Sequence, residues 1–433
     1  MSSNGAAVPA MANGEERKKR KIDAVDGVEG GPASQRHFTE YFTDPEVDNL
    51  RIESIKAVIY PQLLMEEIPN TPQGKRTVQQ ARQAVSDILN GKDDRLVVVV
   101  GPCSIHDAKA AIEYGTRLKA EATRLSKDLL ILMRVYFEKP RTTVGWKGLI
   151  NDPHLDESYD INHGLKIGRR ILADINNMEL PCACEFLDTM IPQYIADLVA
   201  WAAIGARTTE SQLHRQLASG LSMPVGFKNA TSGDIQVAID AVRSAQFPHS
   251  FLSITKQGLP AIVLSMGNKD THVVLRGGAT GPNYASEHIQ GAADKLTKNK
   301  VVPKVMVDCS HGNSQKDHNR QPKVAEDICS QLSKGEMGIM GVMIESHLFE
   351  GKQDLPTGDK LSDIINNKND SPTTLHGSGP GQLGPEGQRS TVLSSLRYGV
   401  SVTDACIHWM DTVKVLENLA AAVRQRREAV AKK

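Results

Sequence analysis

Six basic side chains lie at or just after the ends of short apolar runs in this sequence. They are Arg134, Lys139, Arg141, Arg207, Lys228 and Arg276. Any one of them alone would be interpreted as half of a surface ion pair. Six cations gathered at one place repel one another unless anions are bound there, and phosphate and carboxylate are the usual anions. Arginine can hold such a group through two parallel hydrogen bonds, whereas lysine offers a point charge and a transferable proton. The set predicts a site for phosphorylated or carboxylated small molecules.

A second set of residues offers sulfur, nitrogen and oxygen donors at other run ends. Cys103, His311, Glu345 and Asp404 form a mixed soft and hard set of the kind that binds a borderline first-row divalent ion. Their spacing is too long to form a local ligand motif. A buried cysteine is usually a small core residue, and a lone histidine is usually a satisfied one. From the residues alone, a metal site and ordinary packing therefore remain equal alternatives.

Both sets need a scaffold that brings distant run ends together. From about residue 95, short β-branched runs alternate with helical stretches, a pattern typical of βα units and a parallel sheet. The predicted strands cover residues 96–100, 130–136, 182–186, 203–207, 224–228, 272–276, 304–309 and 341–344. Eight units favour a (β/α)8 TIM barrel over an open sheet. In that fold the chemistry lies at the C-terminal ends of the strands, where both residue sets are found.

Several segments lie outside this repeat. Two extended runs predict a β-hairpin at residues 250–267, inserted between the fifth and sixth barrel strands. Residues 361–396 are rich in Asn, Gly, Pro and Ser and predict a low-complexity surface insert, or unspliced coding sequence. An amphipathic helix at about 412–427 closes the chain. The predicted organisation is a disordered tail (1–45), an N-terminal extension with regulatory or oligomer contacts (46–95), a catalytic barrel (96–427) and a C-terminal tail (428–433).

Composition argues against several classes of protein. The chain has 51 Lys plus Arg and 51 Asp plus Glu, so no overall charge attracts nucleic acid or a membrane surface. A basic run at 17–21 resembles a nuclear-import signal, but a solvated charge run explains it more simply. The six cysteines have no framework spacing, which favours reduced thiols and a cytoplasmic protein. No apolar run is long enough to predict a membrane span.

Apart from Arg134, the candidate site residues named so far lie in segments that resemble the type I 3-deoxy-D-arabino-heptulosonate 7-phosphate (DAHP) synthases, in their amino-acid-regulated fungal and enteric form. The segments are GPCSIHD (101–107), EKPRTTVGWKGLINDP (138–153), GARTTESQLHR (205–215), PVGFKN (224–229), LRGG (275–278), DCSHGNS (308–314), GVMIES (341–346) and VTDAC (402–406). The resemblance spans about 48–427, apart from the insert. It implies condensation of phosphoenolpyruvate with erythrose 4-phosphate, the first step of the shikimate pathway. The related 3-deoxy-octulosonate phosphate synthases, which use arabinose 5-phosphate, would leave the hairpin and the N-terminal segment unexplained.

The resemblance also implies roles for individual residues. The metal ligands would be Cys103, His311, Glu345 and Asp404, with Mn²⁺, Fe²⁺, Co²⁺ or Zn²⁺ as the ion. Phosphoenolpyruvate would contact Arg134, Lys139, Lys228, Arg207, Arg276 and the backbone of Ala206, and erythrose 4-phosphate would contact Arg141 and Thr142. Lys139 is our candidate proton donor, because neighbouring cations should lower its pKa towards neutrality. We expect His106 to orient the site from behind the ligands.

In the family, feedback inhibition acts on the hairpin and the N-terminal segment. The positions carried over are Asp48, Pro192, Gln193, Leu217, Leu221, Ser222, Phe251 and Ser253. Serine at position 253 implies phenylalanine as the inhibitor rather than tyrosine, because a tyrosine hydroxyl would need the room that the serine fills. Ordinary packing of these residues is the alternative.

The resemblance further implies a homodimer or homotetramer. The chain departs from the family pattern at Gln216, Ala230, His408 and Met410; at the last two, Gly and Glu are usual.

Overall fold

The structure is a computed structural model that describes residues 47–141, 145–366 and 391–432. The predicted tail, its basic run at 17–21 and most of the insert lie outside these residues. The chain divides into two compact units, residues 1–57 and 58–433. In the smaller unit only residues 47–57 are described, and they contain no helix or strand. Everything that follows concerns the larger unit, in whose described part no helix is long and apolar enough to cross a membrane.

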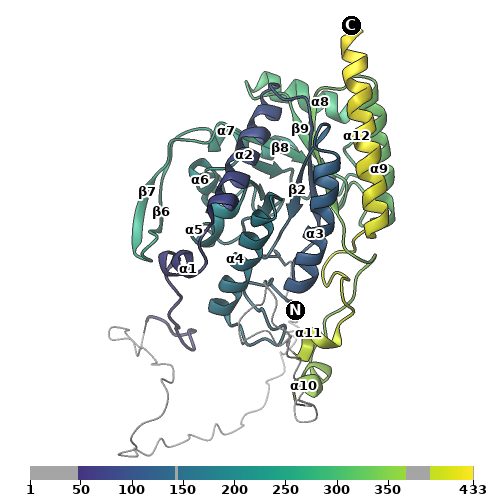
Figure 1. Ribbon diagram of the computed structural model, residues 1–433. Helices are drawn as coiled ribbons and strands as arrows, with labels where there is room; N and C mark the ends of the chain where they lie inside the picture. Colours follow the sequence, from purple (N-terminus) through teal and green to yellow (C-terminus); the bar gives the residue numbers. More distant parts are fainter. Residues whose placement is uncertain (1–46, 142–144, 367–390, 433) are drawn as a thin grey trace, which may run out of the picture. The chain divides into compact units, whose positions relative to one another are not determined.

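Eight parallel strands close into a barrel, as predicted (Figure 1). They are β1 (Leu96–Gly101), β2 (Leu129–Arg134), β3 (Cys182–Glu185), β4 (Trp201–Ile204), β5 (Val225–Lys228), β8 (Thr271–Leu275), β9 (Val305–Asp308) and β10 (Ile339–Glu345). The barrel closes where β1 pairs with β10, with Gly101 opposite Glu345. The fourth strand ends three residues earlier than predicted, because the carbonyl of Gly205 accepts the N–H groups of Thr208 and Thr209 and turns the chain.

Helices follow the strands and cover the outside of the barrel. They are α3 (Ala108–Arg124), α4 (Ile161–Asn177), α5 (Pro192–Ile195), α6 (Gln212–Gly220), α7 (Gln236–Ala245), α8 (Ser286–Lys298), α9 (Gln321–Ser333) and α12 (Trp409–Ala431). Polar side chains fix several of their starts. Asp107 caps α3 by accepting the N–H groups of Lys109 and Ala110. This cap ends the GPCSIHD segment and so fixes the turn that carries Cys103.

The N-terminal extension forms the floor of the barrel. It contains α1 (Pro61–Glu67) and α2 (Pro72–Leu89). Buried residues of α2, including Val85 and Ile88, form one apolar cluster with inward-facing residues of the strands, among them Val97, Trp201 and Met306. Burying this face of α2 closes the N-terminal end of the barrel against water. The polar strand ends therefore meet only at the opposite end.

The predicted hairpin is present as β6 (Ser250–Ile254) and β7 (Pro260–Leu264), an antiparallel pair outside the barrel (Figure 1). Its turn requires glycine at position 258, where φ is +79°. A Cβ atom there would lie 2.4 Å from the ring of Tyr60. Lys256 donates a hydrogen bond to the carbonyl of Gln193 on α5. The hairpin is thus tied to the elements beside the barrel rather than to the barrel itself.

Both C-terminal predictions need correction. The insert is narrower than predicted, because its edges form α10 (Asp359–Asn366) and α11 (Thr391–Ser395), which bury Leu361 and Val392 in the main core. The closing helix α12 continues to Ala431, so the predicted tail is helical almost to its end. Arg427 holds these last turns by ion pairs of 2.7 Å with Asp94 and 2.5 Å with Asp128.

A buried histidine near the barrel floor should make the fold sensitive to acid. His272 is 1% exposed and accepts the indole N–H of Trp201 at 3.3 Å, and burial lowers its pKa to about 3. An unfolded histidine titrates near 6.5, so its contribution to stability is complete above that pH and is lost as the pH falls towards 3. Between about pH 7 and about pH 5, we expect the free energy of unfolding to fall by about 2 kcal/mol more in wild type than in His272→Gln. Glutamine at this position keeps an acceptor for the indole N–H of Trp201.

Urea unfolding of both proteins at the two pH values measures this difference. His288→Gln, at an exposed position on α8, controls for the loss of an imidazole. Equal pH dependence in wild type and His272→Gln would contradict the prediction.

Candidate active site

Three of the predicted metal ligands meet at the C-terminal end of the barrel. Cys103 follows β1, Glu345 ends β10, and Asp404 lies in the loop before α12. One donor atom from each lies within 4.8 Å of the other two, and the Cys103 thiol is 3.4 Å from an Asp404 oxygen. The β1–β10 pairing brings the first two together, and the chain returns across the mouth to supply the third.

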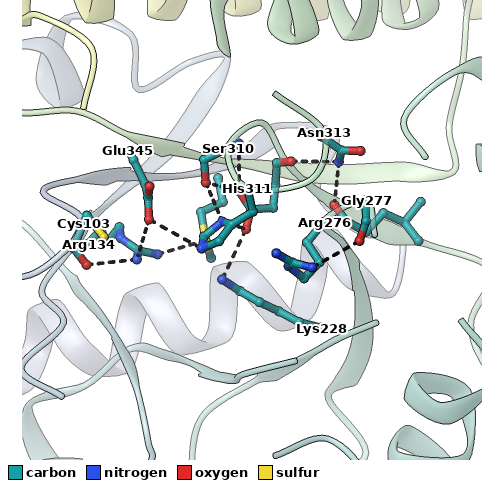
Figure 2. Close-up of polar contacts among 12 residues, drawn as sticks. Cys103, Arg134, Lys228, Arg276, Gly277, Ser310, His311, Asn313 and Glu345 are labelled. Atoms are coloured by element: carbon teal, nitrogen blue, oxygen red, sulfur yellow. Dashed lines mark hydrogen bonds and ion pairs between the residues drawn. The ribbon is translucent and has the colours of Figure 1, made fainter. Parts of the chain in front are cut away.

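His311 completes the set from the end of β9. Its Nε2 atom is 3.8 Å from the Glu345 carboxylate, while its Nδ1 atom is 2.9 Å from Asp308 and 2.7 Å from the Ser310 hydroxyl (Figure 2). Because Asp308 can only accept, Nδ1 donates a proton to it, and this contact turns Nε2 towards Glu345. His311 has φ of +55°, a conformation that few non-glycine residues adopt. One thiol, one imidazole and two carboxylates fit a borderline divalent ion.

Lys139 lies directly against this set. Its ammonium is 3.0 Å from the Cys103 sulfur and 3.6 Å from Asp404. Burial would lower the pKa of Lys139, but the charges of Cys103, Asp404 and Glu345 outweigh burial and raise it above its ordinary value. The predicted lowering of this pKa is therefore wrong. The prediction assumed that cations surround Lys139, whereas its immediate neighbours are the metal-binding side chains.

The same environment sets the protonation of the ligands. Burial, reinforced by Glu345, raises the pKa of the Cys103 thiol to about 11. Desolvation would raise the pKa of Asp404, but the charges of Lys139 and His311 outweigh it and hold that pKa well below its usual range. A divalent ion held by these residues would stabilise the thiolate, because its binding would displace the thiol proton.

Besides Lys139, which lies against Asp404, two more of the six predicted cations have carboxylate partners. Arg134 is 1% exposed, pairs with Glu345 at 3.0 Å and also donates to the carbonyls of Pro102 and Cys103. Lys228 pairs with the buried Asp308 at 3.2 Å (Figure 2). Carboxylates of the chain itself balance these charges, so the six cations do not by themselves require bound anions. Arg134 and Lys228 brace the ligand residues in this structure.

The remaining cations line the mouth. Arg276 has no carboxylate partner in the described part of the chain, and its backbone is fixed on both sides: its N–H donates to Asn229, and its carbonyl accepts from Asn313. Arg207 reaches across to the carbonyl of Pro140 at 3.2 Å, next to the half-buried Ala206. Arg141 is exposed and donates to the carbonyl of Trp146. Thr142 lies outside the described residues.

The structure adds three side chains that the sequence did not single out. Asp308 orients His311 and neutralises Lys228, and as the only carboxylate at the end of β9 it could have been suspected. The ring of Tyr136 lies 3.6 Å from the Arg134 guanidinium. Burial raises the pKa of Glu138 to about 8, and its carboxyl group accepts the N–H groups of Leu187 and Asp188, which anchors the segment that carries Lys139. Neither Tyr136 nor Glu138 has a sequence signal of its own.

The predicted His106 is buried, with its ring 6.2 Å from that of His347.

The predicted effector residues gather only in part. Phe251 and Ser253 lie on β6, which contacts α6, the helix that buries Leu217. Leu221 and Ser222 follow α6 directly, and Pro192 and Gln193 begin α5, where Lys256 of the hairpin is bound. Asp48 belongs to the smaller unit, so the structure does not place it against the hairpin.

The chain is similar to known proteins over most of its length. A profile described as "DAHP synthetase I family" matches residues 70–371. A putative phospho-2-dehydro-3-deoxyheptonate aldolase from Schizosaccharomyces pombe is 51% identical over 89% of this chain and 96% of that protein. The Phe-sensitive phospho-2-dehydro-3-deoxyheptonate aldolase of Escherichia coli K12 is 52% identical over 88% of this chain and 98% of its own length. A solved aldolase of the same name from Francisella tularensis SCHU S4 superposes with a TM-score of 0.77 at 52% identity, covering 87% of this chain and 99% of that one.

Proposed function

The chain belongs to the DAHP synthetase I family, and from this premise we propose how its residues divide the work of the reaction. The protein is a 3-deoxy-7-phosphoheptulonate synthase, a transferase of aromatic amino acid biosynthesis. It joins phosphoenolpyruvate, erythrose 4-phosphate and water to give DAHP and phosphate. The observation that carries the residue assignments is the cluster of Cys103, Glu345, Asp404 and His311, with the Lys139 ammonium against it.

The four donor residues would hold the divalent ion. When bound, a divalent ion supplies Lewis-acid polarisation of the aldehyde carbonyl and stabilises the alkoxide that develops on it. Asp308 keeps the lone pair of His311 Nε2 turned towards the site, and Arg134 fixes the carboxylate of Glu345. The Mn²⁺, Fe²⁺, Co²⁺ and Zn²⁺ ions all suit this donor set, so it does not select one of them.

The basic side chains would hold the two phosphorylated substrates. Lys228, Arg276 and Arg207 come from three different strand ends and, with the Ala206 backbone, are our candidates for binding phosphoenolpyruvate. The buried Arg134 would also contact phosphoenolpyruvate. Arg141 and Thr142 would bind erythrose 4-phosphate. Holding both substrates in one orientation lowers the entropic part of the barrier before any bond forms.

Lys139 is our candidate for the group that moves a proton during the condensation. The enol carbon attacks the aldehyde carbon, water adds to the cationic centre left behind, and the hemiketal then loses phosphate by cleavage of a carbon–oxygen bond. The Lys139 ammonium lies 3.0 Å from the Cys103 sulfur, beside the proposed metal site, and is therefore placed to donate a proton to the developing alkoxide. His106 would support the site from behind.

A coupled assay tests the activity and the choice of aldose. Loss of phosphoenolpyruvate should depend on erythrose 4-phosphate and should release one phosphate per turnover. Arabinose 5-phosphate is the discriminating alternative substrate. Faster turnover with it would contradict the proposed function.

Phenylalanine is the effector that we propose for the hairpin site. The argument rests on Ser253, which is half-buried opposite Ala261 on β7. We expect phenylalanine to inhibit at least about tenfold more strongly than tyrosine or tryptophan, because the serine takes the room of a phenolic hydroxyl. Ser253→Gly should narrow that preference by about tenfold. Separate inhibition curves for the three amino acids measure this preference, and inhibition by tyrosine alone would contradict the assignment.

We further propose that the protein is cytoplasmic, in keeping with its six free thiols. We also propose that it is a homodimer or homotetramer.

A further inference from the structure

A pocket of about 670 Å³ opens at the N-terminal end of α12. Phe349 and Glu350 line it from the loop after β10, Arg397 and Tyr398 from the segment after α11, and His408 and Asp411 from the start of α12. None of these residues belongs to the proposed metal, substrate or hairpin sites. Its volume lies within the range of small-molecule sites, which is roughly 300–1,000 Å³.

Charges of both signs line this pocket without pairing to one another. In the part of the chain that the structure describes, neither Glu350 nor Asp411 makes an ion pair, and the guanidinium of Arg397 donates only to the carbonyl of Lys352, at 3.1 Å. All three residues are exposed, so water solvates these charges and leaves them open to a ligand. A ligand that carries both an ammonium and a carboxylate would satisfy all three.

Besides Val400, the pocket is lined by three aromatic rings, two of which are fixed by hydrogen bonds. Tyr398 donates its hydroxyl to Glu113 at 2.7 Å, and His408 accepts the N–H of Met410 at 3.1 Å as the N-cap of α12. Phe349 remains 51% exposed, with its ring centre 6.1 Å from that of His408 at an angle of 48°. Fixed rings with an exposed face suit a third ring stacked against them, because little conformational entropy is lost on binding. His408 is one of the positions where the chain departs from the family pattern.

We propose that this pocket binds a free aromatic α-amino acid. The ammonium of the ligand would lie between Glu350 and Asp411, its carboxylate would pair with Arg397, and its ring would pack on Phe349 and His408. The site lies on different elements from the hairpin, so the two can be tested separately.

Equilibrium dialysis of the full-length protein with radiolabelled L-phenylalanine tests the proposal. Ser253→Tyr fills the proposed hairpin site, so binding that survives in this variant reports on the pocket. In that background we expect one molecule bound per chain, and Phe349→Ala and Asp411→Asn should each weaken binding by about tenfold. His408→Asn should act like Phe349→Ala, since asparagine keeps the helix cap and removes only the ring. Thermal melting of each variant checks that it is folded.

The proposal would be overturned if L-phenylalanine did not bind to Ser253→Tyr at millimolar concentration, or if Phe349→Ala left binding unchanged. Tighter binding of 2-phenylethylamine, which lacks the carboxylate, would overturn it as well. If wild type and Ser253→Tyr each bind one L-phenylalanine per chain, the pocket is supported, and the result counts only against the proposed effector site at the hairpin. Tighter binding of 3-phenylpropionate, which lacks the ammonium, would also overturn the proposal.

Discussion

Cys103→Ser is expected to lower kcat by at least about a thousandfold and to abolish retention of the divalent ion. Cys103 is the only sulfur donor in the cluster, and its atom lies within 4.8 Å of the Glu345 and Asp404 oxygens. A serine hydroxyl in the same place is a poor ligand for a borderline ion and stays protonated. Removing the ion from wild type with a chelator should have the same effect on turnover, and adding Mn²⁺ back should reverse it.

Metal content measured by mass spectrometry separates loss of the ion from loss of the fold. Cys329→Ser is the matched control, because Cys329 is a free thiol on α9 outside the cluster. It should retain both metal and activity. A Cys103→Ser protein with one ion per chain and near-normal turnover would contradict the assignment of the site.

Lys139→Met is expected to lower kcat by about 10²- to 10⁴-fold, the usual range for a group that transfers a proton. Lys139→Arg should lose nearly as much, although it keeps the positive charge. A guanidinium does not release its proton, and its larger head must fit where the Lys139 side chain is only 12% exposed and 3.0 Å from the Cys103 sulfur. The effect should fall on kcat more than on the KM for phosphoenolpyruvate.

Steady-state kinetics of the two variants make this distinction. Lys147→Met is the control, because Lys147 is exposed on the same segment and its backbone carbonyl accepts the N–H of Lys139. Near-normal turnover of Lys139→Arg would exclude proton transfer by this residue. A rise in KM with an unchanged kcat would assign it to substrate binding instead.

Local sequence determined much of the scaffold. The alternation of β-branched runs with helical stretches is set by side-chain periodicity and chain stiffness, which act within a few residues, so the eight strands and the hairpin could be predicted. The errors lie where a backbone hydrogen bond or a distant contact decides the boundary. Gly205 ends the fourth strand early, and the edges of the insert become helical because Leu361 and Val392 find a core to enter.

The sequence also determined which residue types stand at the strand ends, because the barrel fold directs every such end to one mouth. It could not determine the charge that each side chain meets there. Coulomb interactions depend on distances between residues up to hundreds of positions apart, such as Lys139 and Asp404, and only the closed barrel sets those distances. The tertiary structure therefore reversed the expected pKa shift of Lys139 and gave Arg134 and Lys228 carboxylate partners. It also revealed Asp308 as the group that orients His311, because a buried ion pair exists only once the chain has folded around it.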